Sequence, residues 1–112
     1  MRQSIHAPII VNPKDIPWKK IATGVAIKDL AHDKSKNQKL TLFKFGKGTK
    51  LKTHKHAAVE WVYVLDGVYQ DEFCSVPKGQ LKINTKGSVH TSQPKRGCLL
   101  LVVWSGAHIT VR

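Results

Sequence analysis

The sequence predicts a small all-β domain built as a sandwich or a barrel. Short alternating or wholly apolar runs, separated by Gly, Pro, Asn and Asp, occur throughout the chain, and nowhere do apolar residues recur at helical spacing over several turns. The 112 residues suit one domain, and the 41% of hydrophobic residues suit a chain that folds by itself around one core. Any functional site must therefore be supported by a single β fold.

Nine strands are expected, with turns rich in Gly, Pro, Asn or Asp between them. The expected strands cover residues 24–30, 39–45, 51–56, 59–65, 68–73, 80–83, 89–92, 98–104 and 109–111. The strongest turn signal is Asp66 followed by Gly67, because an Asp-Gly pair between β-rich runs accepts the positive φ angles of a two-residue hairpin. Residues 1–20 contain three prolines and are expected to form an extended arm that Trp18 fixes to the domain of residues 21–112.

The chain is strongly basic, with 19 Lys and Arg against 7 Asp and Glu and a formal net charge of +12. The lysines are scattered singly and no helix-turn-helix pattern organises them, so we interpret the charge as a solvated surface and do not expect nucleic-acid binding.

No signal segment opens the sequence, and the longest apolar run, residues 98–104, is too short to span a bilayer. We expect a cytoplasmic protein without membrane contact, in which Cys74 and Cys98 are reduced thiols packed in strands.

The segment GTKLKTHKHAAVEWVYVLDG carries the residues with the clearest chemistry. His54 and His56 are separated by one residue, so on a strand their side chains point to the same face. Glu60 shares a face with Val62 and Val64, which places its carboxylate toward a core. An ionised carboxylate there is costly unless it binds a cation or has a hydrogen-bonded partner. The pattern therefore indicates a metal site.

Two imidazoles and a carboxylate suit Fe(II), Mn(II), Ni(II), Co(II) or Zn(II). His90 begins a later strand after Gly87 and can project into the same interior from the opposite side. We therefore expect one divalent metal ion held by His54, His56, Glu60 and His90. Two roles stay open for Glu60, which is either the fourth ligand or a catalytic base behind the metal.

Other polar residues are interpreted as lying outside the site. We do not expect His6, His32 or His108 to be ligands, because they fall in the arm, in a polar turn and in a turn between the terminal strands. Asp71 and Glu72 are adjacent on a strand and must face opposite ways, so at most one of them points inward.

These residues resemble the cupin superfamily. The first cupin motif is matched by Gly48, His54, His56, Glu60 and Gly67 with every spacing correct, and the second is matched by Gly79, Gly87 and His90. Thr85 stands where the second motif usually has proline, and Pro94 replaces its trailing Asn. The resemblance implies a single-domain jelly-roll β-barrel with the two His, the Glu and the later His as metal ligands.

A narrower likeness covers most of the chain. The stretches PWKKIATGVAIKDL, VYVLDGVYQDEF, GSVHTS and RGCLLLVVW resemble the cupin-like domain of ChrR-type anti-sigma factors and the related acetylacetone dioxygenases. Trp61 occupies a position where that group often has a second Glu, which could reshape the cavity wall. We do not expect sigma-factor inhibition by this sequence alone, because it has no N-terminal zinc-binding domain of the anti-sigma kind.

The resemblance implies two alternative functions. The first is a non-haem Fe(II) dioxygenase that cleaves a small carbonyl compound such as a β-diketone, with Val62, Val64, Ile83 and Leu101 as apolar walls that exclude water. The second is a non-catalytic sensor or ligand-binding module in which the metal, Fe, Zn, Ni or Mn, stabilises the fold or receives a small molecule. Four protein ligands are typical of such structural sites.

Two expectations concern partners. If Lys50 and Lys52 share the face of His54, they lie near the barrel mouth and would attract an anionic small molecule. The short chain leaves the edges of its sheets with little cover, so we expect a homodimer.

Overall fold

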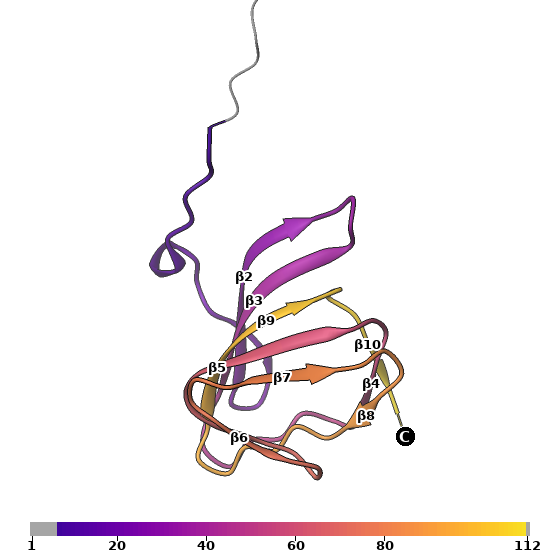
Figure 1. Ribbon diagram of the computed structural model, residues 1–112. Helices are drawn as coiled ribbons and strands as arrows, with labels where there is room; N and C mark the ends of the chain where they lie inside the picture. Colours follow the sequence, from indigo (N-terminus) through magenta and orange to yellow (C-terminus); the bar gives the residue numbers. More distant parts are fainter. Residues whose placement is uncertain (1–6, 112) are drawn as a thin grey trace, which may run out of the picture.

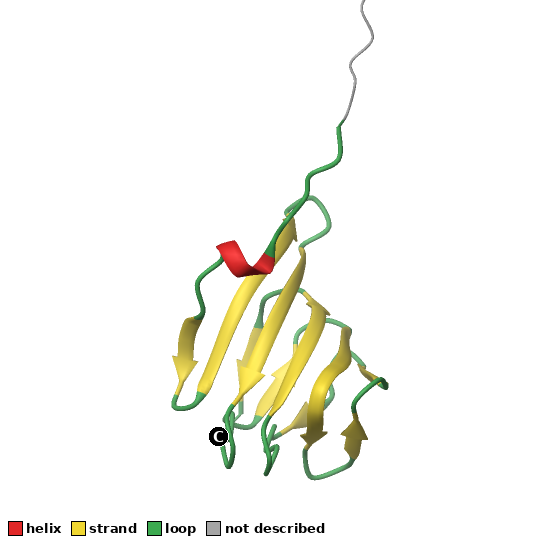
Figure 2. Ribbon diagram, turned by 90° about the vertical axis from the view of Figure 1, so that its left-hand side faces the viewer, coloured by secondary structure: helices red, strands yellow, loops and turns green. Residues whose placement is uncertain are grey.

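The computed structural model describes residues 7–111, and its ten strands form two sheets (Figures 1 and 2). The elements are η1 (Pro13–Asp15), β1 (Lys19–Ala22), β2 (Val25–Asp33), β3 (Gln38–Phe45), β4 (His54–His56), β5 (Glu60–Gln70), β6 (Ser75–Pro77), β7 (Leu81–Asn84), β8 (Val89–His90), β9 (Cys98–Trp104) and β10 (His108–Thr110). The expected all-β class is confirmed. No helix in the described part of the chain is long and apolar enough to span a membrane.

The larger sheet has seven strands in the order β1-β2-β3-β9-β5-β6, with β7 also paired to β5. The smaller sheet has three strands in the order β10-β4-β8 and lies to one side of the larger one (Figure 1). All pairings are antiparallel. The core consists of apolar side chains that alternate along β2, β3, β5 and β9, among them Val25, Phe43, Val64 and Leu100.

The expected hairpin at Asp66 and Gly67 is wrong, because β5 runs without a break from Glu60 to Gln70. β9 pairs with both halves of this strand, and the register shifts between Val64 and Asp66, so Leu65 is the extra residue of a β-bulge. Gly67 has φ +71°, as the Asp-Gly signal implies, but a Cβ there would lie 2.5 Å from the carbonyl oxygen of Gly97. The glycine therefore allows the strand to pass close to its neighbour instead of reversing direction.

The bulge changes which residues of β5 face the interior. Before it, the even-numbered Glu60, Val62 and Val64 are buried, whereas after it the odd-numbered Tyr69 is only 2% exposed. A regular strand would turn Tyr69 outward, since side chains alternate with a period of two. The extra residue thus brings Tyr69 into the same interior as Glu60.

The remaining strands lie at the expected positions: β9 has the expected bounds, β2 and β3 extend further than expected, and the others are shorter or shifted. Two strands, β1 and β6, were not expected. β4 is limited to three residues because the chain before it is held by single contacts, such as the bond from the Leu51 amide to the Ser92 carbonyl. β1 begins at Lys19 and pairs with β2, so the sheet takes in the last two residues of the expected arm. Trp18 lies below the ammonium groups of Lys28 and Lys44, which attach the arm to β2 and β3.

We expect Gly67→Ala to lower the free energy of unfolding by about 2–5 kcal/mol, because the variant combines a strained left-handed backbone with overlap against Gly97. Gly79→Ala is the matched control, since its φ is +86° but nothing lies within 4 Å of an added Cβ. Its cost should stay near 1–2 kcal/mol. Urea unfolding measures both, and equal losses would contradict the close approach at Gly67.

Candidate metal centre

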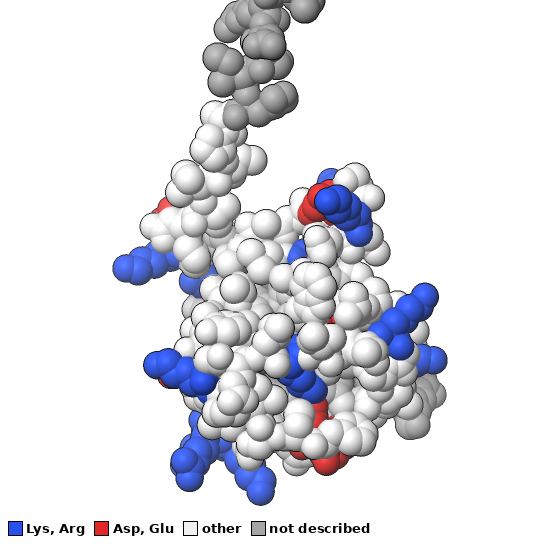
Figure 3. All heavy atoms as spheres, in the orientation of Figure 1, with Lys and Arg blue, Asp and Glu red and all other residues white. Residues whose placement is uncertain are grey.

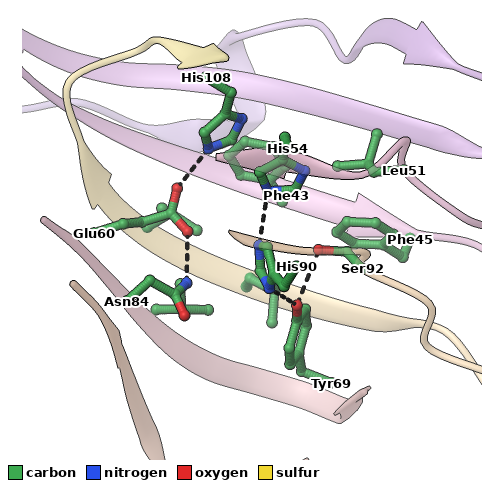
Figure 4. Close-up of a pocket in the computed structure, with 13 residues that line it drawn as sticks. Phe43, Phe45, Leu51, His54, Glu60, Tyr69, Asn84, His90, Ser92 and His108 are labelled. Carbon is green, nitrogen blue, oxygen red and sulfur yellow. Dashed lines mark hydrogen bonds and ion pairs between the residues drawn. The ribbon is translucent and has the colours of Figure 1, made fainter. Parts of the chain in front are cut away.

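The smaller sheet brings four histidines together. His54 and His56 lie on the same face of β4, as their spacing predicts, and both are buried. His90 of β8 is the direct cross-strand partner of His54, and His108 of β10 is that of His56. Cross-strand partners have their Cβ atoms only about 5 Å apart, so the pairing brings all four rings together. Figure 4 shows three of them, His54, His90 and His108.

The Nδ1 atoms of three rings point away from that space toward hydrogen-bond acceptors. His54 Nδ1 lies 2.9 Å from the Lys52 carbonyl oxygen, and His90 Nδ1 lies 2.8 Å from a carboxylate oxygen of Asp71. His56 Nδ1 lies 3.1 Å from the Ser88 carbonyl oxygen and 2.8 Å from the Ser88 hydroxyl. Carbonyl and carboxylate oxygens only accept, so each Nδ1 carries the proton and each Nε2 is left with a bare lone pair.

The three Nε2 atoms converge. Those of His54 and His90 are 2.7 Å apart, and all three lie within 4.8 Å of one another. Among residues 7–111, Nε2 of His56 is the buried side-chain polar atom that has no hydrogen-bond partner. Two lone pairs that face each other repel unless a proton or a metal cation lies between them, and neutral imidazole nitrogens are good ligands for divalent transition metals. The donor set therefore fits a metal ion.

The electrostatics of the site keep His54 and His90 neutral. Burial, with smaller contributions from the neighbouring imidazoles, lowers the pKa of His54 to about 4, and the hydrogen bond to the Lys52 carbonyl opposes this shift only in part. Burial also lowers the pKa of His90, partly opposed by its hydrogen bond to Asp71. Both rings are therefore unprotonated at Nε2 near neutral pH, which is the form that binds a metal.

Glu60 faces the interior, as its parity with Val62 predicts, and its carboxylate is held at both oxygens. Oε1 accepts a hydrogen bond from Asn84 Nδ2 at 2.9 Å and lies 3.4 Å from His56 Nε2, while Oε2 lies 2.9 Å from His108 Nε2 (Figure 4). Burial alone would raise the pKa of Glu60, but the hydrogen bond from His108 holds it below the usual range. Glu60 is therefore an anion beside the three bare nitrogens.

His108 lies in a different place from the one that the sequence analysis expected. It begins β10 and lines the cavity, its ring stacks on His54 with centroids 4.2 Å apart, and it also contacts Trp104. His56, Glu60 and His108 form a second group that could hold a metal ion. The sequence does not predict this position of His108, because it depends on the pairing of β10 with β4. These two strands are about fifty residues apart in the chain.

The rings of His54, His90 and His108 line a cavity whose other wall is apolar. Val62 lines it, as expected, together with Phe43, Phe45, Leu51, Leu100 and Val102. The expectation for Ile83 and Leu101 is wrong: Ile83 is 57% exposed, and Leu101 alternates away from its inward neighbours on β9. Val64 is buried in the core beside the cavity without lining it.

The structure also shows where two pairs of charged residues lie, Lys50 with Lys52 and Asp71 with Glu72. The side chains of Lys50 and Lys52 are exposed, and neither lines the cavity, because the chain before β4 is not a regular strand. Of the adjacent acids, Asp71 points inward to His90, whereas Glu72 is exposed and accepts a hydrogen bond from the Thr91 amide.

Cys74 and Cys98 are free thiols, as expected, and burial raises the pKa of Cys98 to about 12.

Comparison with known families bears out the resemblance seen in the sequence. The profile of the ChrR cupin-like domain matches residues 6–106 of this chain. The chain belongs to this family. Its two sheets are accordingly a single-domain cupin jelly roll. No curated protein sequence matches the chain.

Solved structures share the cupin fold at low sequence identity. An RmlC-like cupin protein from Ralstonia eutropha JMP134 has a TM-score of 0.85 and 19% identity, covering 95% of this chain and 73% of that one. A putative acetylacetone dioxygenase from Methylibium petroleiphilum PM1 has a TM-score of 0.86 and 13% identity, covering 100% and 86%. The complex of SigE with the anti-sigma ChrR from Rhodobacter sphaeroides has a TM-score of 0.72 and 23% identity, covering 83% of this chain and 50% of that one. This cupin therefore spans half the length of the chain it matches in that complex.

We expect the metal-free cupin to lose stability as the pH falls from about 6.5 to about 4. Over this window His54 is neutral when folded but takes up a proton when unfolded, so the unfolded state binds more protons and acid favours it. Urea unfolding of EDTA-treated protein across this range measures the loss. His54→Asn should make the pH dependence shallower, whereas the exposed His32→Asn should leave it unchanged. Equal slopes in both variants would contradict the assignment.

Proposed function

We propose that this cupin binds one divalent metal ion through His54, His56 and His90, with Glu60 beside it, and that the bound metal serves a dioxygenase acting on a small carbonyl compound such as a β-diketone. The observation that carries the proposal is the convergence of three Nε2 atoms on one another, with one carboxylate oxygen beside them. The similarity in fold to the putative acetylacetone dioxygenase supports the reaction class.

The division of the cavity into a polar and an apolar side suits a small oxygen-bearing substrate. When bound, the metal would supply Lewis acidity and positions at which oxygen atoms of substrate and O₂ can be held. The aromatic rings of Phe43 and Phe45, with Leu100, form the opposite wall and exclude water from the reacting groups. Glu60 is ionised and held by Asn84, so it can accept a proton from an acidic carbon of the substrate.

A second candidate function is a metal-containing sensor or ligand-binding module without turnover. It is favoured by the position of Glu60, whose Oε1 lies 3.4 Å from His56 Nε2 and could complete a four-ligand site. If Glu60 is a ligand, fewer positions stay open for substrate. The role of this one carboxylate therefore separates the two functions. The role of Glu60 also bears on whether the metal is Fe, Zn, Ni or Mn, since open sites of two His and a carboxylate suit Fe(II).

His54→Ala and His90→Ala should each abolish stoichiometric metal binding, because either change removes one of three converging nitrogens. The metal content of freshly purified protein, measured by mass spectrometry, tests this result. His32→Ala is the matched control, since His32 is exposed on β2 and lies outside the cavity. Full metal content in His54→Ala would show that the ligand assignment is wrong.

Oxygen uptake by the Fe(II)-loaded protein with a panel of β-diketones tests the dioxygenase. We expect uptake that is lost in Glu60→Gln while the metal content is kept, because a base behind the metal can be removed without removing the metal. Loss of both would assign Glu60 as a ligand. No uptake by the wild type with any diketone, together with stoichiometric zinc, would favour the sensor.

We also propose a homodimer. On the outer face of the larger sheet, Trp61 is paired with Ile83 and Tyr63 with Leu81, and all four side chains are at least 40% exposed. In Figure 3 much of the area over β5 is uncharged, while Lys or Arg atoms lie over β7 and further Lys and Arg side chains lie near the margin of this face. Light scattering should give twice the mass of 12.5 kDa, and a single-chain mass would refute the dimer.

A further inference from the structure

A buried carboxylate lies directly behind one of the proposed ligands. The side chain of Asp71 has no exposed surface, and its Oδ2 accepts hydrogen bonds from three groups. His90 Nδ1 donates at 2.8 Å, the Tyr69 hydroxyl donates at 3.0 Å, and the Lys82 ammonium group forms an ion pair with the same oxygen. Asp71 lies on the side of the His90 ring away from Nε2 and does not line the cavity.

The fold holds this carboxylate in a fixed orientation. Its other oxygen, Oδ1, accepts the backbone amides of Phe73 and Cys74 at 2.9 and 3.1 Å, so the chain turns around the side chain immediately after β5. Asp71 follows the bulge at Leu65 and therefore has the same inward parity as Tyr69. Without the extra residue, this carboxylate would face outward.

Lys82 reaches the same cluster from β7, where it is paired with the inward-facing Val62. Its ammonium group lies 3.1 Å from His90 Nδ1, and its side chain is only 14% exposed. Lys82 and Asp71 form an ion pair, and the Tyr69 hydroxyl donates to the same carboxylate oxygen. One negative and one positive charge therefore lie together behind the imidazole.

We propose that Asp71 is a positioning residue for the metal centre, which fixes His90 in the tautomer protonated at Nδ1 and strengthens Nε2 as a donor, and that Lys82 limits this effect by neutralising Asp71. The inference rests on the proposed metal binding. It follows from the chemistry of imidazole, because a hydrogen bond from one ring nitrogen to an anion orients the ring and raises the basicity of the other nitrogen.

The two residues should therefore act on metal affinity in opposite directions. Asp71→Asn removes the anion and leaves the Lys82 cation close to His90, which weakens the attraction for a divalent cation. Lys82→Met removes the cation and leaves the anion uncompensated, which strengthens that attraction. A purely structural role would lower the stability of both variants and would not separate the signs of their effects on affinity.

Titration of the metal-free protein with Co(II), followed by its visible absorption, tests the proposal. Asp71→Asn should raise the Kd about 10- to 100-fold and shift the absorption bands, as removal of a carboxylate behind a histidine ligand does elsewhere. Lys82→Met should lower the Kd. Asp29→Asn and Lys39→Met are matched controls, because they change the same charges at an ion pair on β2 and β3 and should leave the Kd and the bands as in the wild type.

The outcomes separate this inference from the proposed function. Absence of Co(II) and Zn(II) binding by the wild type would overturn the proposed function and this inference with it. Binding by the wild type, with an unchanged Kd and spectrum in Asp71→Asn or a raised Kd in Lys82→Met, would overturn the positioning role alone.

A measurement on the wild type does not depend on the folding of any variant. Long-range proton–nitrogen NMR of the metal-free protein should show the ring proton of His90 on Nδ1. A proton on Nε2 would mean that Asp71 does not set the tautomer, and it would overturn the inference directly.

Discussion

The site depends on where three imidazole protons are held. Each Nδ1–H of His54, His56 and His90 is directed outward to an oxygen that can only accept, and this choice leaves three lone pairs aimed at one small space. The acceptors come from the chain before β4, from the loop before β8 and from the turn after β5. Residues from three loops therefore orient the three imidazoles of the candidate metal centre.

The sequence was sufficient for the parts of this site that depend on local geometry. The shared face of His54 and His56 follows from their separation by one residue, and the inward direction of Glu60 follows from its parity with Val62. His90, expected from its place at the start of a later strand and from the spacing of the second cupin motif, pairs directly with His54. Each of these inferences rests on a few neighbouring residues or on a known motif spacing, and none of them requires the register between distant strands.

The features that the sequence did not reveal depend on register. Asp66 and Gly67 have the composition of a hairpin turn, but pairing of both halves of β5 with β9 makes them part of one bulged strand. His108 reaches the cavity only through the pairing of β10 with β4, and Leu101 leaves it because Leu100 and Val102 face inward. A local pattern predicts how side chains alternate along a strand, whereas the pairing of one strand with another depends on the free energy of the whole core.

The small size of the β10-β4-β8 sheet has a consequence for dynamics. Its strands have three, three and two residues, so few backbone hydrogen bonds hold them together. A metal bound to His54, His56 and His90 would join β4 to β8 across 36 residues of chain and would act as a removable cross-link. Local opening of this sheet, rather than global unfolding, would then be the motion that sets how fast a metal ion enters and leaves the protein.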